Sequence, residues 1–218
     1  QDIVEVVDEE MGEDYAKLAG LTAEEDLNEP LLESMKKRIP WLAVLLVLGM
    51  IVSAVVGVFE QVVSQLTIVV CFQSLILGMA GNAGTQSLAV TIRVLMDENL
   101  TGGQKLRLMF KEMRVGAVNG FLLGLLSLVF IGCYIALVKG RGFGFGFAVS
   151  ACIGFSLTIA MLISSITGTV IPMFFHKVKI DPAVASGPLI TTVNDLVAVV
   201  TYYGMTWLLL IHLLQLAE

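Results

Sequence analysis

The chain has 218 residues, of which 56% are hydrophobic and 15% are charged, and its mean hydropathy is +0.87. These values exclude an ordinary soluble domain and are typical of a protein that crosses a membrane several times. The net charge of −6 is unevenly spread: residues 1–33 hold 12 acidic residues and one lysine, whereas residues 34–218 have a net charge of +5. The basic residues lie at the ends of apolar runs, where membrane topology explains them, so the sequence predicts no nucleic-acid binding.

Residues 1–37 are acidic and contain no apolar run long enough to cross a bilayer. Leu21, Leu27 and Leu31 could share one face of an amphipathic helix. We therefore expect either a solvated linker helix or a connector that acts on the membrane part of the chain.

Five later runs are apolar enough to cross a hydrocarbon core of about 30 Å, which needs about 20 helical residues. They are predicted at residues 40–63, 66–96, 115–138, 143–175 and 188–216. Pro40 is expected in the first turn of the first span, where its missing amide does no harm. The predicted fold is an all-α integral membrane protein with five transmembrane helices per subunit.

Two of these runs are rich in glycine. The second run contains Gly78, Gly81 and Gly84 near its centre, which predicts an interrupted helix there. The third run repeats glycine every four residues, and such a pattern permits close packing of helices within one chain or between two chains.

The charges of the loops predict the orientation in the membrane. With the N-terminus inside, ten basic residues of the membrane part lie in the cytoplasm, and only Lys139 and Arg141 lie outside. Basic residues gather on the cytoplasmic side of membrane proteins. The sequence therefore predicts a cytoplasmic N-terminus and an external C-terminus.

Asp195 is the candidate functional residue that stands out most. Apart from Asp181, it is the only charged side chain between Lys179 and Glu218, and it lies inside the fifth apolar run. A carboxylate within the membrane costs a few kcal/mol or more, so such residues usually serve ions or substrates. The structural alternative is that Asp195 pairs with Asn82 or Gln86 of the second run.

One carboxylate does not balance a divalent cation, but two copies related by a two-fold axis would supply a charge of −2. Carboxylate, hydroxyl, amide and carbonyl oxygens suit Mg²⁺, which gives up its water reluctantly. The membrane runs contain no cluster of histidine and cysteine, which argues against a zinc or copper site. The three cysteines (Cys71, Cys133 and Cys152) are predicted to be small buried apolar residues.

Three segments together resemble the MgtE-type magnesium channels: Asp181–Asp195 (DPAVASGPLITTVND), Gly81–Ser87 (GNAGTQS) and Arg38–Leu42 (RIPWL). The resemblance implies a homodimer in the cell membrane, not an enzyme, with a pore for Mg²⁺ on its two-fold axis lined by spans two and five. It implies that Asp195 recognises hydrated Mg²⁺ together with the backbone carbonyl of Thr191. The pore-lining residues that it implies are Gly81, Asn82, Thr85, Gly187 and Thr192.

Members of this family usually carry cytoplasmic CBS modules ahead of the channel. The resemblance therefore implies that residues 1–37 are the remnant of such a module followed by a connecting helix that plugs the pore, and that residues 38–218 are the five-span channel domain. The acidic residues of the connecting helix would take part in gating; they are Glu24, Glu25, Asp26 and Glu29.

Two other classes of protein stay open as alternatives. A cation-coupled carrier would use Asp195 to bind Na⁺ or H⁺ during alternating access, and a scaffold subunit would use its helices only for packing. A membrane enzyme is disfavoured, because the apolar runs lack the paired catalytic groups that a protease would need.

Overall fold

The structure is a computed structural model that describes residues 28–95, 100–179 and 187–216. Every element within these ranges is helical. In chain order the elements are α2 (Leu31–Val58), α3 (Glu60–Gln65), the 3-10 helix η1 (Thr67–Val69), α4 (Val70–Leu95), α5 (Gly102–Cys133), the π-helix η2 (Tyr134–Val138), α6 (Phe143–Lys177), α7 (Gly187–Met205) and the π-helix η4 (Thr206–Leu213). The predicted all-α fold is confirmed for the described part of the chain.

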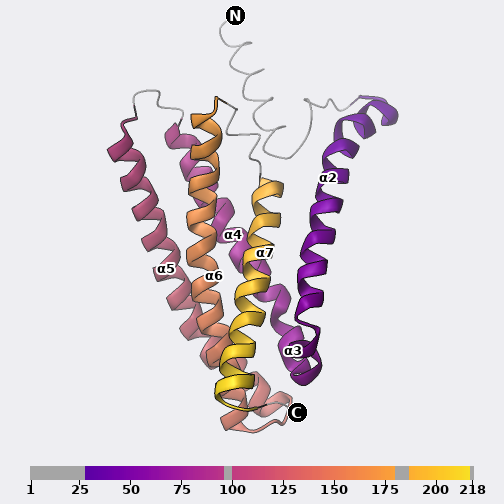
Figure 1. The fold of residues 1–218 in the computed structure, drawn as a ribbon, viewed down its shortest axis with the longest axis vertical. Helices are drawn as coiled ribbons and strands as arrows, with labels where there is room; N and C mark the ends of the chain where they lie inside the picture. The colour runs from indigo at the N-terminus through magenta and orange to yellow at the C-terminus, as the bar shows by residue number, and fades with distance from the viewer. Residues whose placement is uncertain (1–27, 96–99, 180–186, 217–218) are drawn as a thin grey trace, which may run out of the picture.

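Five helices are long and apolar enough to cross a membrane, as predicted. They cover Leu31–Val58, Thr67–Leu95, Gly102–Val138, Phe143–Lys177 and Leu189–Leu213. Figure 1 shows them running alternately down and up through one bundle, and α7 begins below the upper ends of α5 and α6. The first turn of α7 therefore lies at a lower level along the bundle than the upper ends of these two helices.

The first span begins earlier than predicted. α2 starts at Leu31, so Pro40 lies inside the helix and not in its first turn. A proline inside a helix removes the amide that would bond the carbonyl four residues earlier, here that of Lys36. The described part of the predicted connecting helix is thus continuous with the first span.

The predicted interruption of the second span was wrong. α4 is α-helical from Val70 to Leu95. Its glycines provide space for close contacts instead: a Cβ on Gly84 would overlap the side-chain amide of Asn194, and a Cβ on Gly168 of α6 would overlap the carbonyl oxygen of Gly84. Because two neighbouring helices press directly on this turn, glycine is needed there for its small size and not for an irregular backbone.

α5 and α6 form the tightest pair in the bundle. A Cβ on Gly120 would lie 2.8 Å from the Cα of Thr158, and one on Gly124 would lie 2.7 Å from the carbonyl oxygen of Gly154. The Thr158 hydroxyl lies 3.1 Å from the carbonyl oxygen of Gly120 and 2.9 Å from that of Gly154. The glycine repeat of α5 is therefore used for packing within the chain.

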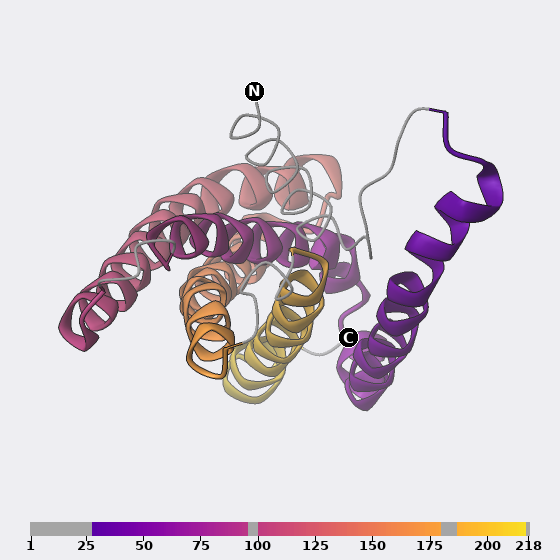
Figure 2. The same ribbon diagram turned by 90° about the horizontal axis from the view of Figure 1, so that it is seen from above.

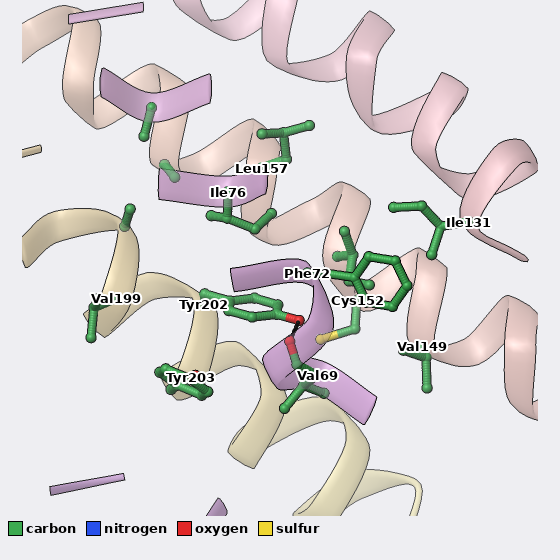
Figure 3. Packing of buried hydrophobic residues seen from close by; sticks show 14 of the residues in the cluster. Val69, Phe72, Ile76, Ile131, Val149, Cys152, Leu157, Val199, Tyr202 and Tyr203 are labelled. Atoms are coloured by element: carbon green, nitrogen blue, oxygen red, sulfur yellow. Dashed lines mark hydrogen bonds between the residues drawn. The ribbon is translucent and has the colours of Figure 1, made fainter. Parts of the chain in front are cut away.

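The buried core lies where η1, α4, α6 and α7 meet (Figure 3). Tyr202 is fully buried, and its hydroxyl donates a hydrogen bond of 2.7 Å to the carbonyl oxygen of Val69. Cys152 lies in this core as predicted and Cys133 is half-buried, but the prediction was wrong for Cys71, which is exposed. Cys71 lies on a face of α4 that the described residues do not cover.

α2 stands at one side of the bundle and meets the other long helices mainly through α7 (Figure 2). None of the most apolar window of α2 is buried, compared with 56% of that of α6. The four helices α4 to α7 thus form a packed bundle, and α2 lies at its periphery.

Candidate functional site

Asp195 lies on α7, eight residues after the first residue of that helix, which corresponds to about 12 Å of helix. Its side chain is half-buried, and so is that of Thr191, one turn earlier on the same face. α7 itself begins below the upper ends of α5 and α6 (Figure 1). Asp195 thus lies within the fifth candidate span, Leu189–Leu213, as the sequence predicts.

Two contacts bring α7 against the glycine-rich centre of α4. A Cβ on Gly81 would lie in ordinary contact with Thr191, 3.5 Å from its Cγ2. One turn along, a Cβ on Gly84 would overlap Asn194 and lie 2.8 Å from its Cγ. The structure therefore brings together the two segments that the sequence singled out, through Gly81 and Thr191 of the predicted set.

Asn82 and Thr85 lie next to this contact but face away from it. Asn82 is at the midpoint of α4, and both side chains are exposed, as is that of Gln86. The Thr85 hydroxyl donates a hydrogen bond of 3.0 Å to the carbonyl oxygen of Gly81, in its own helix. The exposed polar groups at mid-helix thus lie on a surface of α4 that the described residues do not cover.

The other predicted pore-lining and gating residues lie in three different parts of the chain. Thr192 is half-buried on α7, and Gly187 is the first residue of that helix. Glu29 lies just before α2 and forms an ion pair with Lys37 at 2.6 Å. The other predicted gating residues, Glu24, Glu25 and Asp26, lie outside the described residues.

Asn194 is a residue that the sequence analysis missed. It is fully buried, and neither polar atom of its side chain has a hydrogen-bond partner among the described residues. Buried amides of this kind are uncommon because each unpaired group loses its hydration. A signal was available in the sequence, since Asn194 directly precedes Asp195 and lies four residues after the apolar Ile190, on the same face of a helix.

Glu112 is a second missed residue. It is 4% exposed and accepts a hydrogen bond of 3.1 Å from the Ser87 hydroxyl of α4, while Lys111 lies 3.5 Å from its other oxygen. The periodicity of α5 could have revealed it, because Leu108, Glu112 and the three buried glycines recur every four residues on one face. Glu112 thus joins α5 to the polar centre of α4.

The described residues contain no group of three or more histidine, cysteine, aspartate or glutamate side chains that could hold a metal ion. Asp195 therefore offers a single carboxylate, accompanied by the hydroxyl and carbonyl oxygens of its own helix. This donor set suits a hydrated hard cation better than a stripped transition metal. The charge of one copy is half of what a divalent ion needs.

Known proteins with similar sequences identify the family of this chain. Residues 73–205 match the MgtE family, described as a divalent cation transporter. Among similar proteins, the magnesium transporter MgtE of Enterococcus faecalis is 39% identical over 204 residues, which are 94% of this chain and 43% of the relative. The proteins of the same name from Bacillus subtilis and Thermus thermophilus are 36% and 27% identical over 94% and 96% of this chain, and over 43% and 45% of the relatives.

The chain thus spans less than half the length of these relatives. The family match reaches from α4 to the end of α7, and so it includes both segments that meet at Gly81 and Thr191. The chain belongs to the MgtE family of divalent cation transporters, which confirms the resemblance found in the sequence.

Proposed function

We propose that the chain forms the membrane part of a channel that conducts hydrated Mg²⁺ down its electrochemical gradient. The observation that carries this proposal is the uncovered polar surface at the middle of α4, made of Asn82, Thr85 and Gln86. Polar side chains at the centre of a bilayer are costly when they face lipid, and they usually face a water-filled passage or another helix. A pore bounded by a second copy of the chain would supply both the water-filled passage and the neighbouring helices.

The charge of Asp195 supports a two-fold arrangement. Two copies with α7 near a shared axis would bring two carboxylates to one place, and their repulsion would be relieved by one divalent cation. The backbone carbonyl of Thr191 is proposed as a second oxygen ligand for the hydrated ion. Gly81, Asn82, Thr85, Gly187 and Thr192 are proposed to line the same passage.

The family match supports the choice of ion. The relatives that cover 94% of this chain are named magnesium transporters, and a few oxygen ligands with retained water suit Mg²⁺. Entry of a doubly charged ion across 100 mV is favoured by about 4.6 kcal/mol, so the membrane potential is a sufficient driving force.

The proposed setting is the plasma membrane, with the N-terminus in the cytoplasm and the C-terminus outside. Ten basic residues of the membrane part would then lie inside, in agreement with the usual bias of membrane proteins. Residues 1–37 are proposed to be the end of a regulatory module and its connecting helix. The ion pair of Glu29 with Lys37 supports this, because it ties the acidic segment to the first span.

Replacement of the proposed pore acid tests this function. We expect Asp195→Asn to lower Mg²⁺ uptake by about tenfold or more in cells that lack their own Mg²⁺ uptake, because one lost interaction of a few kcal/mol is enough for that change. Glu60→Gln is the matched control, since Glu60 is an exposed carboxylate at the start of α3. Equal expression and equal oligomeric state of the two variants complete the comparison.

Normal uptake by Asp195→Asn would contradict the role of the acid, and a dependence of uptake on Na⁺ would favour a coupled carrier instead. Unitary currents from the purified chain in a planar bilayer would support a channel.

A further inference from the structure

A groove of about 830 Å³ lies where α5 begins and α6 ends, at the upper end of the bundle in Figure 1. Its lining divides into a basic group and an apolar group. The basic residues are Lys105, His176, Lys177 and Lys179, and the apolar residues are Val170, Met173 and Phe174. None of these residues belongs to the site around Asp195.

The two groups occupy different depths along α6. Val170, Phe174 and Lys177 follow one another at four and three residues, so they share one face of the helix. Val170 and Lys177 are therefore separated by about 10 Å along the helix axis. The groove is apolar on the side toward the middle of the bundle and basic at its outer end.

The groove lies at the end of the longest uncharged run of the described helices. Residues 142–176 contain no aspartate, glutamate, lysine or arginine, so Lys177 is the first charged residue after a run that fills the hydrocarbon core. Phe174 is 59% exposed just below it, which suits contact with lipid chains and not with water. A basic end beside an apolar lining is the arrangement expected at the depth of phospholipid headgroups.

The positive charge of the groove is not balanced by the described part of the chain. The described residues place no carboxylate within ion-pair distance of Lys105, Lys177 or Lys179. Lys105 belongs to the first turn of α5, Lys177 is the last residue of α6, and Lys179 follows it. Like charges from two helices thus line one space. An anion between them would relieve this repulsion.

We propose that this groove binds an anionic phospholipid, with its phosphate held by Lys105, Lys177 and Lys179 and an acyl chain lying on Val170, Met173 and Phe174. Basic pockets between transmembrane helices bind lipid headgroups in this way. A free phosphate ion would use only the outer half of the lining, whereas a phospholipid matches both halves. The proposal is independent of the ion pathway, because it involves neither Asp195 nor a second copy.

The test measures phospholipid binding to the purified chain in a nonionic detergent by native mass spectrometry. Phosphatidylglycerol, phosphatidylcholine and inorganic phosphate are titrated separately into the wild type and two variants. The groove variant carries Lys105→Gln, Lys177→Gln and Lys179→Gln. The control variant carries Lys36→Gln, Arg93→Gln and Arg107→Gln, which remove the same charge from exposed positions of α2, α4 and α5.

We expect the wild type to retain phosphatidylglycerol in preference to phosphatidylcholine. The groove variant should bind phosphatidylglycerol about a hundredfold more weakly, since each of the three basic residues contributes about 1 kcal/mol near a membrane surface. The control variant should bind it as the wild type does, and inorganic phosphate should not displace it. Phe174→Ser should also weaken the binding while leaving all three lysines in place.

Equal losses in the groove and control variants would overturn the proposal, because they would indicate attraction by the overall charge. Displacement by inorganic phosphate would overturn it in favour of a simple anion site. Displacement by a synthetic peptide of the acidic residues 1–33 would overturn it in favour of that segment as the occupant.

Discussion

α6 and α2 are both long apolar helices, yet they differ in how much of their surface is buried. More than half of the most apolar window of α6 is buried (56%), whereas none of that of α2 is (0%). α6 presents small residues such as Gly154 and Gly168, which let neighbouring backbones approach, while α2 presents mainly leucine and valine to its surroundings. Lipid is as apolar as leucine, so in a membrane small residues decide which helices pack together, and apolarity alone does not.

The same contrast divides the two faces of α4. Gly81, Gly84 and Leu88 are buried against the rest of the chain, whereas Asn82 and Thr85 are exposed at the same depth. One face is thus closed by neighbouring helices, and the other is left uncovered by the described residues. The account of function depends on this open face.

The largest expected effect comes from closing the space between α5 and α6. A Cβ on Gly154 would lie 2.6 Å from the carbonyl oxygen of Gly124, and backbone there cannot move aside cheaply. We expect Gly154→Ala to lower the free energy of unfolding by about 1–3 kcal/mol, as overpacking does. Thermal unfolding of the purified chain in detergent measures the change.

The matched control is Gly49→Ala in α2, where nothing lies within 4 Å of the added Cβ. It should leave stability unchanged or raise it by up to about 1 kcal/mol, because alanine favours the helix. Equal destabilisation by both substitutions would contradict the contrast between a closed α6 and an open α2.

A smaller effect is expected in the core. Tyr202→Phe removes the hydroxyl that bonds the carbonyl oxygen of Val69 at 2.7 Å and leaves that oxygen buried without its donor. The expected loss of stability is about 1–2 kcal/mol. Tyr134→Phe is the control, since Tyr134 is 41% exposed and should contribute almost nothing in the same unfolding measurement. A loss no larger than that of the control would show that the hydrogen bond does not hold η1 to α7.

The smallest effect on stability is expected on the open face of α4. Asn82→Leu should change the unfolding temperature little, because the described residues do not cover this side chain, yet it should lower Mg²⁺ uptake by removing a polar group from the proposed pore. Measurement of both quantities on one preparation separates folding from transport. A destabilisation as large as that of Gly154→Ala, with normal uptake, would mean that Asn82 serves packing.

Much of the fold could be predicted from the sequence, because runs of apolar residues longer than the bilayer core leave few alternatives. The lone Asp195 and the glycine-rich segment of α4 were recognisable for the same reason: each is out of place in lipid. The continuity of α4 was not predictable, since glycines such as Gly81 and Gly84 are also typical of a break in a helix. Only the close approach of α6 and α7 shows that these glycines provide space.

The roles of Asn194 and Glu112 were also hidden, because each depends on a glycine or serine of another helix. Asn194 is buried against Gly84, and Glu112 accepts its hydrogen bond from Ser87. Sequence spacing indicates which residues share a face of a helix, but not which neighbour that face will meet. The exposure of the Asn82 side chain likewise depends on which face of α4 packs against α7.

In the proposed channel, the open faces of two copies enclose one hydrated cation between their Asp195 carboxylates. Diffraction from crystals of the purified chain grown with Mn²⁺ in place of Mg²⁺, recorded at the manganese absorption edge, tests it most directly. The account predicts an anomalous peak on a molecular two-fold axis, about 4 Å from the Asp195 oxygens if the ion keeps its water and about 2.1 Å if it does not. Two copies whose Asp195 side chains face lipid or lie apart from the axis, with no ion between them, would contradict it.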